Sequence, residues 1–440
     1  MRDTEENEMV RLLAEKAASL GGRTYYVGGC VRDSLMGAEC GDVDVEIHGL
    51  RREELENVLD SMGRKLVMGK SFGIYRLAGV NVDIALPRRE RQTGEKHTDF
   101  DIEVDPFIGT EKAASRRDFT VNSIMRDVLT GEIVDHFGGV NDIENKILRH
   151  TNDASFAEDS LRVFRCAMFA SRLGFSVSPD TVSLCRGMDV SSLSAERVNG
   201  ETKKALLLSQ KPSVYFETLR EMGHLSVWYP ELEALIGVEQ DPTRHPEGDV
   251  WTHTMLVLDR AVKYREKAKN PYAFMLACLS HDMGKAVSTE TINGVIHAYG
   301  HETSGISIAE KFVTRLTNEK EILRYVTNFV RLHMKPNITA RASSAVRTTN
   351  RMFDESIDPV SLIGFSECDS GKSDNLPWLE ERYKIYLDYM SRPFVTGRDL
   401  IGAGVTPGED FSALLAFAHK LRLAGVPKEQ AIRQTLKTKK

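Results

Sequence analysis

The chain has 440 residues, of which 41% are hydrophobic and 28% charged, and its formal net charge is −6 at pH 7. This composition excludes a disordered or fibrous chain, and the excess of acid excludes a uniformly basic surface, so any nucleic-acid contact requires a local basic patch. No apolar stretch approaches the ~18 residues of a membrane span, the charged start lacks the core of a secretory signal, and six cysteines without a CxxC pair favour free thiols in the cytoplasm.

The first part of the chain mixes helix and strand signals. Residues 9–19 have the periodicity of an amphipathic helix, and 24–27 predict a short strand. Residues 42–47 alternate acidic and apolar side chains, which predicts a half-buried strand, and 80–85 predict another. Residues 88–101 are polar and aperiodic and therefore predict a long exposed loop.

The pattern becomes helical from about residue 144. Residues 160–173 place apolar side chains along one face, as an amphipathic helix does. The proline-containing segment 241–248 predicts a domain boundary. Residues 250–390 have a helical pattern throughout, and 411–423 predict a helix near the end of the chain.

Four short basic segments are candidates for a nucleic-acid surface. Each is by itself more typical of a solvated face than of a binding site. They are residues 88–91, 116–117, 203–204 and 428–440.

The first candidate site lies in residues 28–46, which read GGCVRDSLMGAECGDVDVE. Gly28 and Gly29 after a strand allow backbone N–H groups to approach a phosphate, and a following helix start adds a positive dipole. Arg32 adds a cation. Asp42 and Asp44 lie two apart on a strand, so both carboxylates project from one face, as oxygen ligands for Mg²⁺ must.

A third carboxylate is usual in two-metal sites. Asp83, on the next predicted strand, is the favoured donor. Glu46 lies on the same face as Asp44 but further along the strand. A bare GG or DxD pattern also occurs in turns with solvated acids, so the complete string carries the prediction.

The complete string resembles the nucleotidyltransferase head of the class II tRNA nucleotidyltransferase and bacterial poly(A) polymerase family, with the form GGxVRDxLLG followed by DxD. Only Met36 departs from that form. Residues 116–122 (RRDFTVN) resemble the family element RRDFTxN, and residues 158–165 (EDSLRVFR) fit EDxxRxxR on a helix. The resemblance implies a nucleotide-binding set of Gly28, Gly29, Arg32, Asp33, Arg117, Asp118, Asn122, Asp159, Arg162 and Arg165.

The chemistry of Asp159 and Arg162 agrees with this resemblance. Residues three apart share a helix face. A carboxylate accepts from the exocyclic amine of cytosine or adenine, and a guanidinium donates to their unprotonated ring nitrogen. Guanine and uracil lack this pattern, so the pair would select C and A without a template. The alternative is an ordinary ion pair on the helix surface.

The polar segment 88–102 contains Thr93-Gly94-Glu95-Lys96-His97, a partial match to a family loop. In the family, a mobile loop at this place governs the switch from C to A addition. The resemblance therefore implies the same role here.

A second candidate site is formed by histidines and aspartates in the order H…HD…D. This order resembles the HD-domain metal-dependent phosphohydrolases. Imidazole and carboxylate ligands suit a divalent transition metal or Mg²⁺, with water as nucleophile. The candidate ligands are His253, His281, Asp282 and Asp369, with His301 and His333 for a second metal. His297 is the expected bystander. The alternatives are satisfied buried histidines or an HD fold without its metal.

Taken together, the motifs predict an α+β protein: a mixed-sheet nucleotidyltransferase palm followed by all-helical neck, body and HD domains. The expected division is 1–143 head, 144–240 neck and body with base recognition and RNA binding, 241–390 HD domain and 391–440 helical tail. Asp42, Asp44 and Asp83 are the expected catalytic residues, and Asp42 and Asp44 the Mg²⁺ ligands.

The resemblance implies templateless addition of CMP and AMP to the 3′ end of tRNA, with CTP and ATP as substrates and no membrane partner. A poly(A) polymerase, an enzyme adding only CC or only A, and a nucleotide-sensing regulator with inert sites are the alternatives. Nothing in the sequence indicates an oligomeric state.

Overall fold

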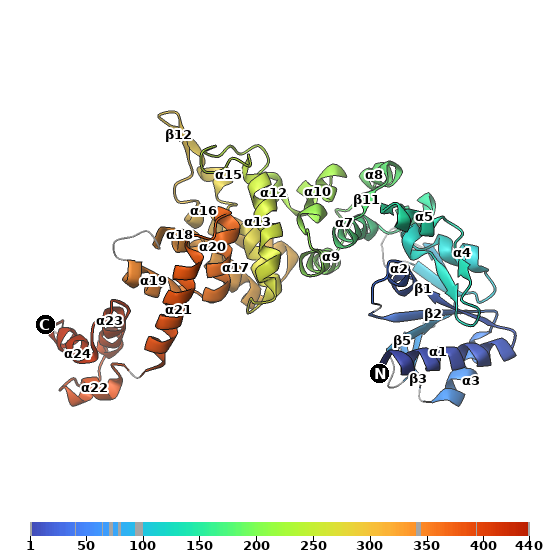
Figure 1. Cartoon of the computed structure of the whole chain (residues 1–440), viewed down its shortest axis with the longest axis horizontal. Helices are drawn as coiled ribbons and strands as arrows, with labels where there is room; N and C mark the ends of the chain where they lie inside the picture. Colours follow the sequence, from blue (N-terminus) through green and yellow to red (C-terminus); the bar gives the residue numbers. More distant parts are fainter. Residues whose placement is uncertain are drawn as a thin grey trace. The chain divides into compact units, whose positions relative to one another are not determined.

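In the computed structural model, the alternating segment at residues 42–47 forms the centre of a seven-stranded mixed sheet (Figure 1). The structure describes residues 2–39, 41–63, 65–69, 74–77, 81–92, 100–339, 345–392 and 394–438. The strand order is β3-β4-β5-β2-β1-β8-β9. The strands are β1 (Arg23–Val27), β2 (Val43–His48), β3 (Lys65–Gly69), β4 (Ile74–Leu77), β5 (Val82–Ala85), β8 (Met125–Asp127) and β9 (Ile133–Val134).

Strand β2 pairs antiparallel with β1 on one side and parallel with β5 on the other. Its apolar residues Val45 and Ile47 are buried in a core that also contains Leu13 and Leu55. Those leucines come from α1 (Arg2–Ser19) and α3 (Arg52–Met62), which lie along one face of the sheet (Figure 1). The period-two pattern therefore has the expected cause: one face of β2 packs on helices.

The expectation of a long loop at 88–101 is wrong for the described residues. β6 (Arg88–Gln92) pairs antiparallel with β7 (Phe100–Val104), with Arg88 opposite Val104. A hairpin ladder is made by backbone groups, so the polar β6 (RRERQ) forms it without the apolar alternation by which strands are predicted. Its partner β7 (FDIEV) does have that alternation. The segment Thr93–His97 lies outside the described residues.

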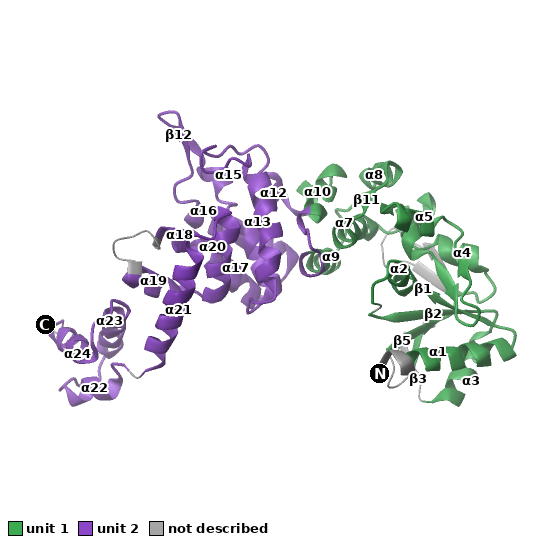
Figure 2. Cartoon of the chain, in the orientation of Figure 1, with its two compact units in different colours: residues 1–205, 214–227 green, residues 206–213, 228–440 purple. Residues whose placement is uncertain are grey.

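Two units divide the chain, one of residues 1–205 and 214–227 and the other of 206–213 and 228–440 (Figure 2). The division into head, neck and body, HD domain and tail stays a prediction. The helices up to residue 228 are α2 (Gly29–Leu35), α4 (Thr110–Ser115), the 3-10 helix η1 (Thr120–Asn122), α5 (Gly139–Glu144), α6 (Asp153–Ala157), α7 (Leu161–Leu173), α8 (Pro179–Arg186), α9 (Ala195–Leu208), α10 (Ser213–Glu221) and α11 (Leu225–Trp228).

The second unit is helical, as the sequence predicts. Its helices are α12 (Pro230–Glu233), α13 (Val250–Arg265), α14 (Pro271–Ser280), α15 (Lys285–Ser288), α16 (His301–Leu316), α17 (Lys320–Leu332), α18 (Lys335–Thr339), α19 (Ala345–Glu355), α20 (Pro359–Ser370), α21 (Leu376–Ser391), α22 (Gly397–Gly402), α23 (Phe411–Leu423) and α24 (Lys428–Lys437). Side-chain caps begin several of them; Asp249, for example, accepts from Thr252 N at α13. No helix within the described residues is long and apolar enough to cross a membrane.

Two short strand pairs depart from the expectation of all-helical regions after the head. β10 (Ile147–Leu148) pairs with β11 (Ser176–Val177), and β12 (Glu290–Ile292) forms a hairpin with β13 (Val295–His297). Asn293 and Gly294 both have positive φ, at 52° and 79°. An Asn-Gly pair of this kind is the usual turn of a two-residue hairpin, so the sequence contained a signal for it.

Aromatic side chains form the centre of the second unit. Phe329 of α17 lies 5.9 Å from Phe274 of α14 and 5.0 Å from Phe365 of α20, measured between ring centroids. The Phe365 ring is in turn 5.1 Å from the His281 ring. The aromatic core therefore supports a predicted metal ligand directly.

Close packing of α15 against α16 allows a specific test. A Cβ on Gly284 would lie 2.0 Å from the backbone oxygen of His301. We expect Gly284→Ala to destabilise the second unit by about 1–3 kcal/mol, because one helix must move. Gly402→Ala, where nothing lies within 4 Å, is the control. Thermal unfolding followed by circular dichroism measures both, and equal midpoints for the two variants would contradict this packing.

Candidate functional site

Three predicted carboxylates lie on, or directly before, two neighbouring strands of the sheet. Asp42 directly precedes β2, and Asp44 lies within it. Because β2 and β5 are parallel and in register, Asp44 lies opposite Asp83. Asn81 Nδ2 donates to Asp42 Oδ1 at 2.8 Å, and Arg76 Nε donates to Asp83 Oδ1 at 2.7 Å. Asp83 is therefore a neighbour of Asp44 that is already paired with a cation.

The electrostatics of Asp44 indicate crowded negative charge. Burial and the charges of Asp83 and Asp42 raise the pKa of Asp44 to about 6, although Arg117 acts in the opposite direction. Like charges at a partly buried site favour a bound cation, and oxygen ligands favour Mg²⁺. Among the described residues, the groups of three possible ligands within 4.8 Å of one another do not include these aspartates.

Glu46 lies further along β2 and has other partners. Its Oε1 is 2.9 Å from His48 Nε2, and its Oε2 is 3.4 Å from Arg116 Nη2 and 3.6 Å from Arg117 Nη2. Burial alone would raise the pKa of Glu46, but the hydrogen bond with His48 and the two arginines outweigh it and lower the pKa to about 2. The charge of the Glu46 carboxylate is therefore balanced by its own neighbours, His48, Arg116 and Arg117. Asp83 remains the candidate third carboxylate.

The Gly28 turn places backbone beside this cluster. Gly28 has φ 70° and ψ −137°, a conformation that residues with a Cβ rarely adopt. A Cβ there would lie 3.2 Å from Arg117 Nη1 and 3.7 Å from Asp44 Oδ2. Glycine therefore allows the chain to pass close to both an arginine and a predicted metal ligand.

Asp42 and Asp44 line a cavity of about 800 Å³, whereas Asp83 is not among its described lining residues. Its described lining is Gly28, Gly29, Arg32, Asp42, Asp44, Arg88, Arg116, Arg117, Asp118, Asn122, Asp159, Leu161, Arg162, Arg165, Phe169, Arg172, Arg197 and Lys204. Eight arginines and one lysine in that lining face four aspartates, so the cavity suits a polyanion such as a nucleoside triphosphate.

Residues from three separate motifs form one hydrogen-bonded chain beside the cavity. Arg32 Nη1 donates to Asn122 Oδ1 at 2.7 Å, and Asn122 Nδ2 donates to Asp118 Oδ1 at 3.0 Å. Arg165 Nε donates to Asp118 Oδ2 at 2.8 Å. Burial raises the pKa of Asp118, but Arg165 and Asn122 outweigh it and lower the pKa. Asp33 accepts from Arg32 Nε at 2.8 Å and is not among the described lining residues, so its contribution is to hold Arg32.

The predicted placement of Asp159 and Arg162 on one helix face is wrong. Asp159 lies in the turn before α7, where its Oδ1 accepts from Leu161 N at 3.0 Å. Its carboxylate pairs with Arg197 at 2.9 Å rather than with Arg162. The Arg162 guanidinium donates instead to two backbone oxygens, of Ser155 and Arg116, at 2.8 Å each. The alternative of an Asp159–Arg162 surface ion pair is therefore not formed, and both side chains line the cavity.

Seven lining residues were not predicted as site residues. They are Arg88, Arg116, Leu161, Phe169, Arg172, Arg197 and Lys204. Helical spacing would have found some of them, because positions 162, 165, 169 and 172 follow one face of α7. Positions 197 and 204, seven apart, share a face of α9 in the same way. Phe169, Arg172 and Arg197 belong to none of the quoted motifs or basic segments, so only the three-dimensional fold connects them to the site.

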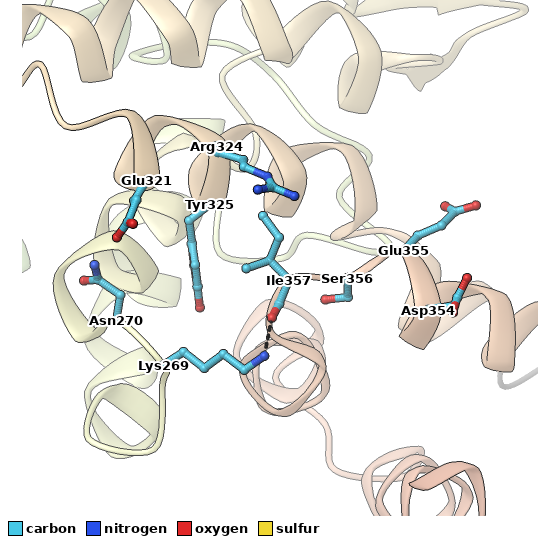
Figure 3. A pocket seen from close by; sticks show the side chains of 9 residues that line it. All are labelled: Lys269, Asn270, Glu321, Arg324, Tyr325, Asp354, Glu355, Ser356 and Ile357. Carbon is cyan, nitrogen blue, oxygen red and sulfur yellow. Dashed lines mark hydrogen bonds between the residues drawn. The ribbon is translucent and has the colours of Figure 1, made fainter. Parts of the chain in front are cut away.

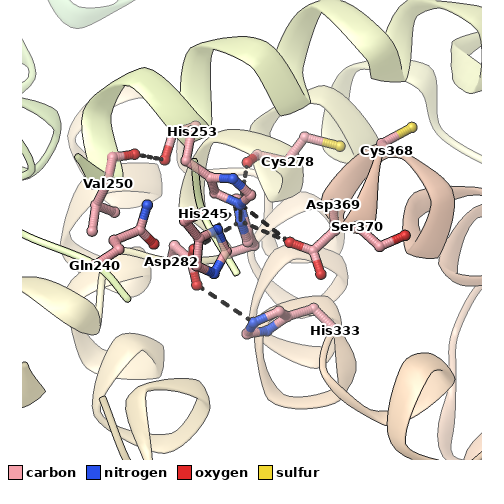
Figure 4. A network of polar contacts seen from close by, with 12 residues as sticks. Gln240, His245, Val250, His253, Cys278, Asp282, His333, Cys368, Asp369 and Ser370 are labelled. Carbon is pink, nitrogen blue, oxygen red and sulfur yellow. Dashed lines mark hydrogen bonds and ion pairs between the residues drawn. The ribbon is translucent and has the colours of Figure 1, made fainter. Parts of the chain in front are cut away.

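The predicted HD residues meet in the second unit (Figure 4). They lie within or directly after five helices, namely α13, α14, α16, α17 and α20. Among the described residues, three groups have their ligand atoms within 4.8 Å of one another, and two of them consist of predicted residues: His253, His281 and Asp369, and Asp282, His301 and His333. The third group is His245, Glu247 and His253. His253 Nε2 lies 3.2 Å from Asp369 Oδ1, and His301 Nε2 lies 3.3 Å from Asp282 Oδ1. His297, the expected bystander, stacks on Tyr299 and is in none of these groups.

The orientation of the rings fits a metal site. In His281, His301 and His333, Nδ1 donates to the backbone carbonyl three residues earlier, at 2.7, 2.7 and 2.6 Å. A carbonyl only accepts, so Nδ1 carries the proton and a neutral ring presents the Nε2 lone pair. His301 Nε2 and His333 Nε2 are 3.2 Å apart. Two such lone pairs repel unless a cation lies between them, so these residues suit a metal.

Two residues beside this cluster were missed. Glu247 Oε1 lies 2.7 Å from His253 Nδ1 and 3.0 Å from His245 Nδ1. Burial lowers the pKa of His253, but hydrogen bonds to Asp369 and Glu247 outweigh it and raise the pKa to about 9. Both missed residues lie in the segment 241–248, for which the sequence predicts only a domain boundary.

The second unit also contains a cavity of about 570 Å³ away from the motifs (Figure 3). It is lined by Lys269, Asn270, Glu321, Arg324, Tyr325, Asp354, Glu355, Ser356 and Ile357. Lys269 Nζ donates to the backbone oxygen of Ile357 at 2.6 Å. None of the predicted site residues lines it, and its charges are mixed.

Known families match both parts of the chain. Residues 24–149 match the poly A polymerase head domain, and residues 250–370 match the HD domain. The chain is 38% identical over 315 residues to the multifunctional CCA protein of Actinobacillus pleuropneumoniae serotype 5b (strain L20), covering 69% of this chain and 74% of that protein. It is 37% identical over 344 residues to that of Pasteurella multocida (strain Pm70), covering 75% and 79%.

Solved structures share the fold. The Thermotoga maritima CCA-adding enzyme complexed with tRNA has a TM-score of 0.65 at 18% identity, with 98% of this chain and 95% of that chain covered. The Bacillus stearothermophilus CCA-adding enzyme in complex with CTP has a TM-score of 0.67 at 20% identity, with 98% and 97% covered.

The head fold, its basic cavity and the histidine cluster define a metal-dependent nucleotidyltransferase joined to an HD domain. Because it is 37–38% identical to multifunctional CCA proteins over 74–79% of their length, the chain belongs to their family.

The pKa of Asp44 predicts how Mg²⁺ binding depends on pH. A carboxyl with a pKa of about 6 is ionised at pH 7.5 and mostly protonated at pH 5.5, so Mg²⁺ should bind roughly fourfold more weakly at the lower pH. Calorimetric titration of the metal-free chain at both pH values measures this. Asp44→Asn, which cannot ionise, should remove that part of the pH dependence. Equal affinity of the unmodified chain at the two pH values would refute the assignment.

Proposed function

We propose that this protein adds CMP and AMP to the 3′ end of tRNA without a nucleic-acid template, and that its HD domain is a metal-dependent phosphohydrolase. One observation carries the first part: the aspartates beside the Gly28 turn and the base-reading candidates Asp159 and Arg162 line the same basic cavity. A nucleotide lying there would reach the carboxylates with its phosphates and Asp159 and Arg162 with its base.

In the proposed reaction, the terminal hydroxyl of the RNA attacks the α-phosphate of a nucleoside triphosphate, and pyrophosphate leaves. Asp42 and Asp44 are the proposed Mg²⁺ ligands, with Asp83 as the third carboxylate. Mg²⁺ bound there stabilises the charge that develops on the phosphate oxygens. Arg117, next to the glycine turn, is placed to neutralise a phosphate, and Arg32 is held by Asn122 to do the same.

Base selection is proposed to rest on Asp159 and Arg162. The exocyclic amine of cytosine or adenine would donate to Asp159, and Arg162 would donate to the unprotonated ring nitrogen. A carboxylate accepts about four hydrogen bonds, so Asp159 can keep Arg197 and still accept from a base. Guanine and uracil present a donor where the arginine also donates, which leaves both unpaired.

At the HD site, the proposed ligands are His253, His281, Asp282, His301, His333 and Asp369. Imidazole-rich ligand sets favour a divalent transition metal, and Mg²⁺ is the alternative. Such an ion supplies Lewis acidity toward a phosphate ester. Lys285, whose Nζ lies 2.7 Å from Asp282 Oδ2, is a cation positioned beside these ligands.

The proposed partners follow from the relatives and the chemistry. The Thermotoga maritima structure contains tRNA, and other CCA-adding enzyme structures are complexes with CTP and ATP. A poly(A) polymerase or an enzyme adding only CC or only A would use the same catalytic residues. We also propose the cytoplasm as the compartment, since the five described cysteines are free thiols.

Labelled nucleotides test the proposal and separate its two sites. The full chain should extend tRNA lacking its 3′ CCA with CTP and ATP, ending after CCA, whereas Asp44→Ala should abolish incorporation because a metal ligand is gone. His281→Ala with Asp282→Ala should keep incorporation and lose hydrolysis of a 2′,3′-cyclic nucleotide.

The product pattern distinguishes CCA, CC, A and poly(A) addition. No incorporation by the unmodified chain would favour a regulator with inert sites. Loss of both activities in a folded HD variant would indicate one composite site rather than two.

The base-reading proposal has its own test. Asp159→Ala and Arg162→Ala should each lose about 1–3 kcal/mol of discrimination, roughly tenfold to a hundredfold, because one base atom remains unpaired. Incorporation efficiency is measured for all four nucleoside triphosphates. Arg172→Ala, in the same cavity but without this role, is the matched control. Unchanged preference for CTP and ATP over UTP and GTP in both variants would disprove the role.

A further inference from the structure

The segment between α12 and α13 contacts the histidine cluster at several points (Figure 4). Gln240 Oε1 accepts from Lys285 Nζ at 2.7 Å, and the His245 ring lies 4.7 Å from the His253 ring, edge to face. Val250 N donates to the backbone oxygen of Val238 at 3.0 Å, which fixes the end of the segment. The segment is therefore an ordered part of the HD site.

His253 is held differently from the other three histidines. Their Nδ1 atoms donate to backbone carbonyls, whereas His253 Nδ1 faces the carboxylate of Glu247 at 2.7 Å. The His253 side chain is fully buried and its Nε2 faces Asp369 at 3.2 Å and His281 Nε2 at 3.4 Å.

We propose that Glu247 is a positioning residue for the HD metal site, which orients His253 and keeps its proton on Nδ1 so that Nε2 is free to bind a cation. The inference rests on the proposed metal-binding function of the HD domain. A carboxylate behind a metal-bound imidazole fixes the tautomer and makes the ring a stronger ligand.

The geometry excludes Glu247 from the ligand set on the Nε2 side. Nδ1 and Nε2 lie on different edges of the imidazole ring, so a carboxylate bound at Nδ1 is directed away from the atoms that Nε2 faces. His245 Nδ1 donates to the same oxygen at 3.0 Å. Glu247 thus has two imidazole partners, and His245 anchors it from the partly exposed side of the segment.

The experiment titrates the metal-free full chain with Ni²⁺ alone, which imidazole ligands bind well, and counts bound ions by equilibrium dialysis. His281→Ala, which removes a proposed ligand, shows how many ions belong to the HD site. Glu247→Ala should bind the same number at saturation with an affinity ten- to a hundredfold lower. Glu247→Gln should recover part of the affinity, because its amide oxygen still accepts from Nδ1–H. Glu239→Gln, at an exposed acid of the same segment, should leave affinity unchanged.

Each of the other possible results contradicts a specific part of the proposal. Unchanged affinity in Glu247→Ala, or a Glu247→Gln affinity no better than that of Glu247→Ala, overturns the positioning role. Loss of an ion at saturation overturns it in favour of Glu247 as a ligand. Equal numbers of ions in the unmodified chain and in His281→Ala would instead remove the metal site, and the proposed HD function with it.

Discussion

The parallel pairing of β2 and β5 is the constraint on which the N-terminal site depends. It sets Asp44 opposite Asp83, and burial together with the charges of Asp83 and Asp42 raises the pKa of Asp44. A fold accepts such repulsion only where cations offset it. Arg76 and Arg117 supply fixed cations, and a divalent ion would supply the rest. The glycine turn, the arginine-rich cavity and the neutralised Glu46 are arranged around this concentration of negative charge.

The HD site surrounds its carboxylates with imidazole rings instead of arginines. Four imidazoles converge on the buried Asp282, the partly buried Asp369 and a lysine, and uncompensated charge would be costly at that depth. Backbone carbonyls at the ends of α14 and α17 and before α16 accept the protons on Nδ1 of three rings, so the helix ends decide which nitrogen faces inward. In His281 and His333 the ring follows a helix directly, where the last carbonyls lack intrahelical partners. Secondary structure therefore fixes the donor atoms of the site.

The sequence predicted the elements that carry a periodic signal and the residues that carry a motif. The alternation at 42–47 and the amphipathic stretch at 160–173 both correspond to observed elements. The β6–β7 hairpin was missed because β6 is polar, although β7 (FDIEV) alternates, and the β12–β13 hairpin was missed despite its Asn-Gly turn. Local patterns describe burial on one face, and a hairpin made by backbone pairing does not need that pattern.

Site residues outside motifs could not be predicted for a different reason. Arg197 and Glu247 act on predicted residues through contacts that span 38 and 6 positions of the chain, and neither contact has a local signature. The prediction that Asp159 shares a helix face with Arg162 failed for a similar reason, because local spacing does not identify contact partners. A spacing of three residues implies a shared face only inside a helix, and Asp159 lies in the turn before one. Sequence spacing thus identified the residues but not their partners.

The contacts of Asp159 and Arg162 bear on how a base would be read. Arg197 and the Leu161 backbone hold Asp159, and two backbone carbonyls hold Arg162. Side chains that are already ordered lose little conformational entropy on binding, so more of each hydrogen bond would contribute to discrimination between bases. A flexible Asp159 could turn to accept from whichever base donates, whereas one fixed by Arg197 cannot follow a misplaced donor. In the proposed base-reading role, that rigidity would favour selectivity, because no complementary strand is present to reject the wrong base.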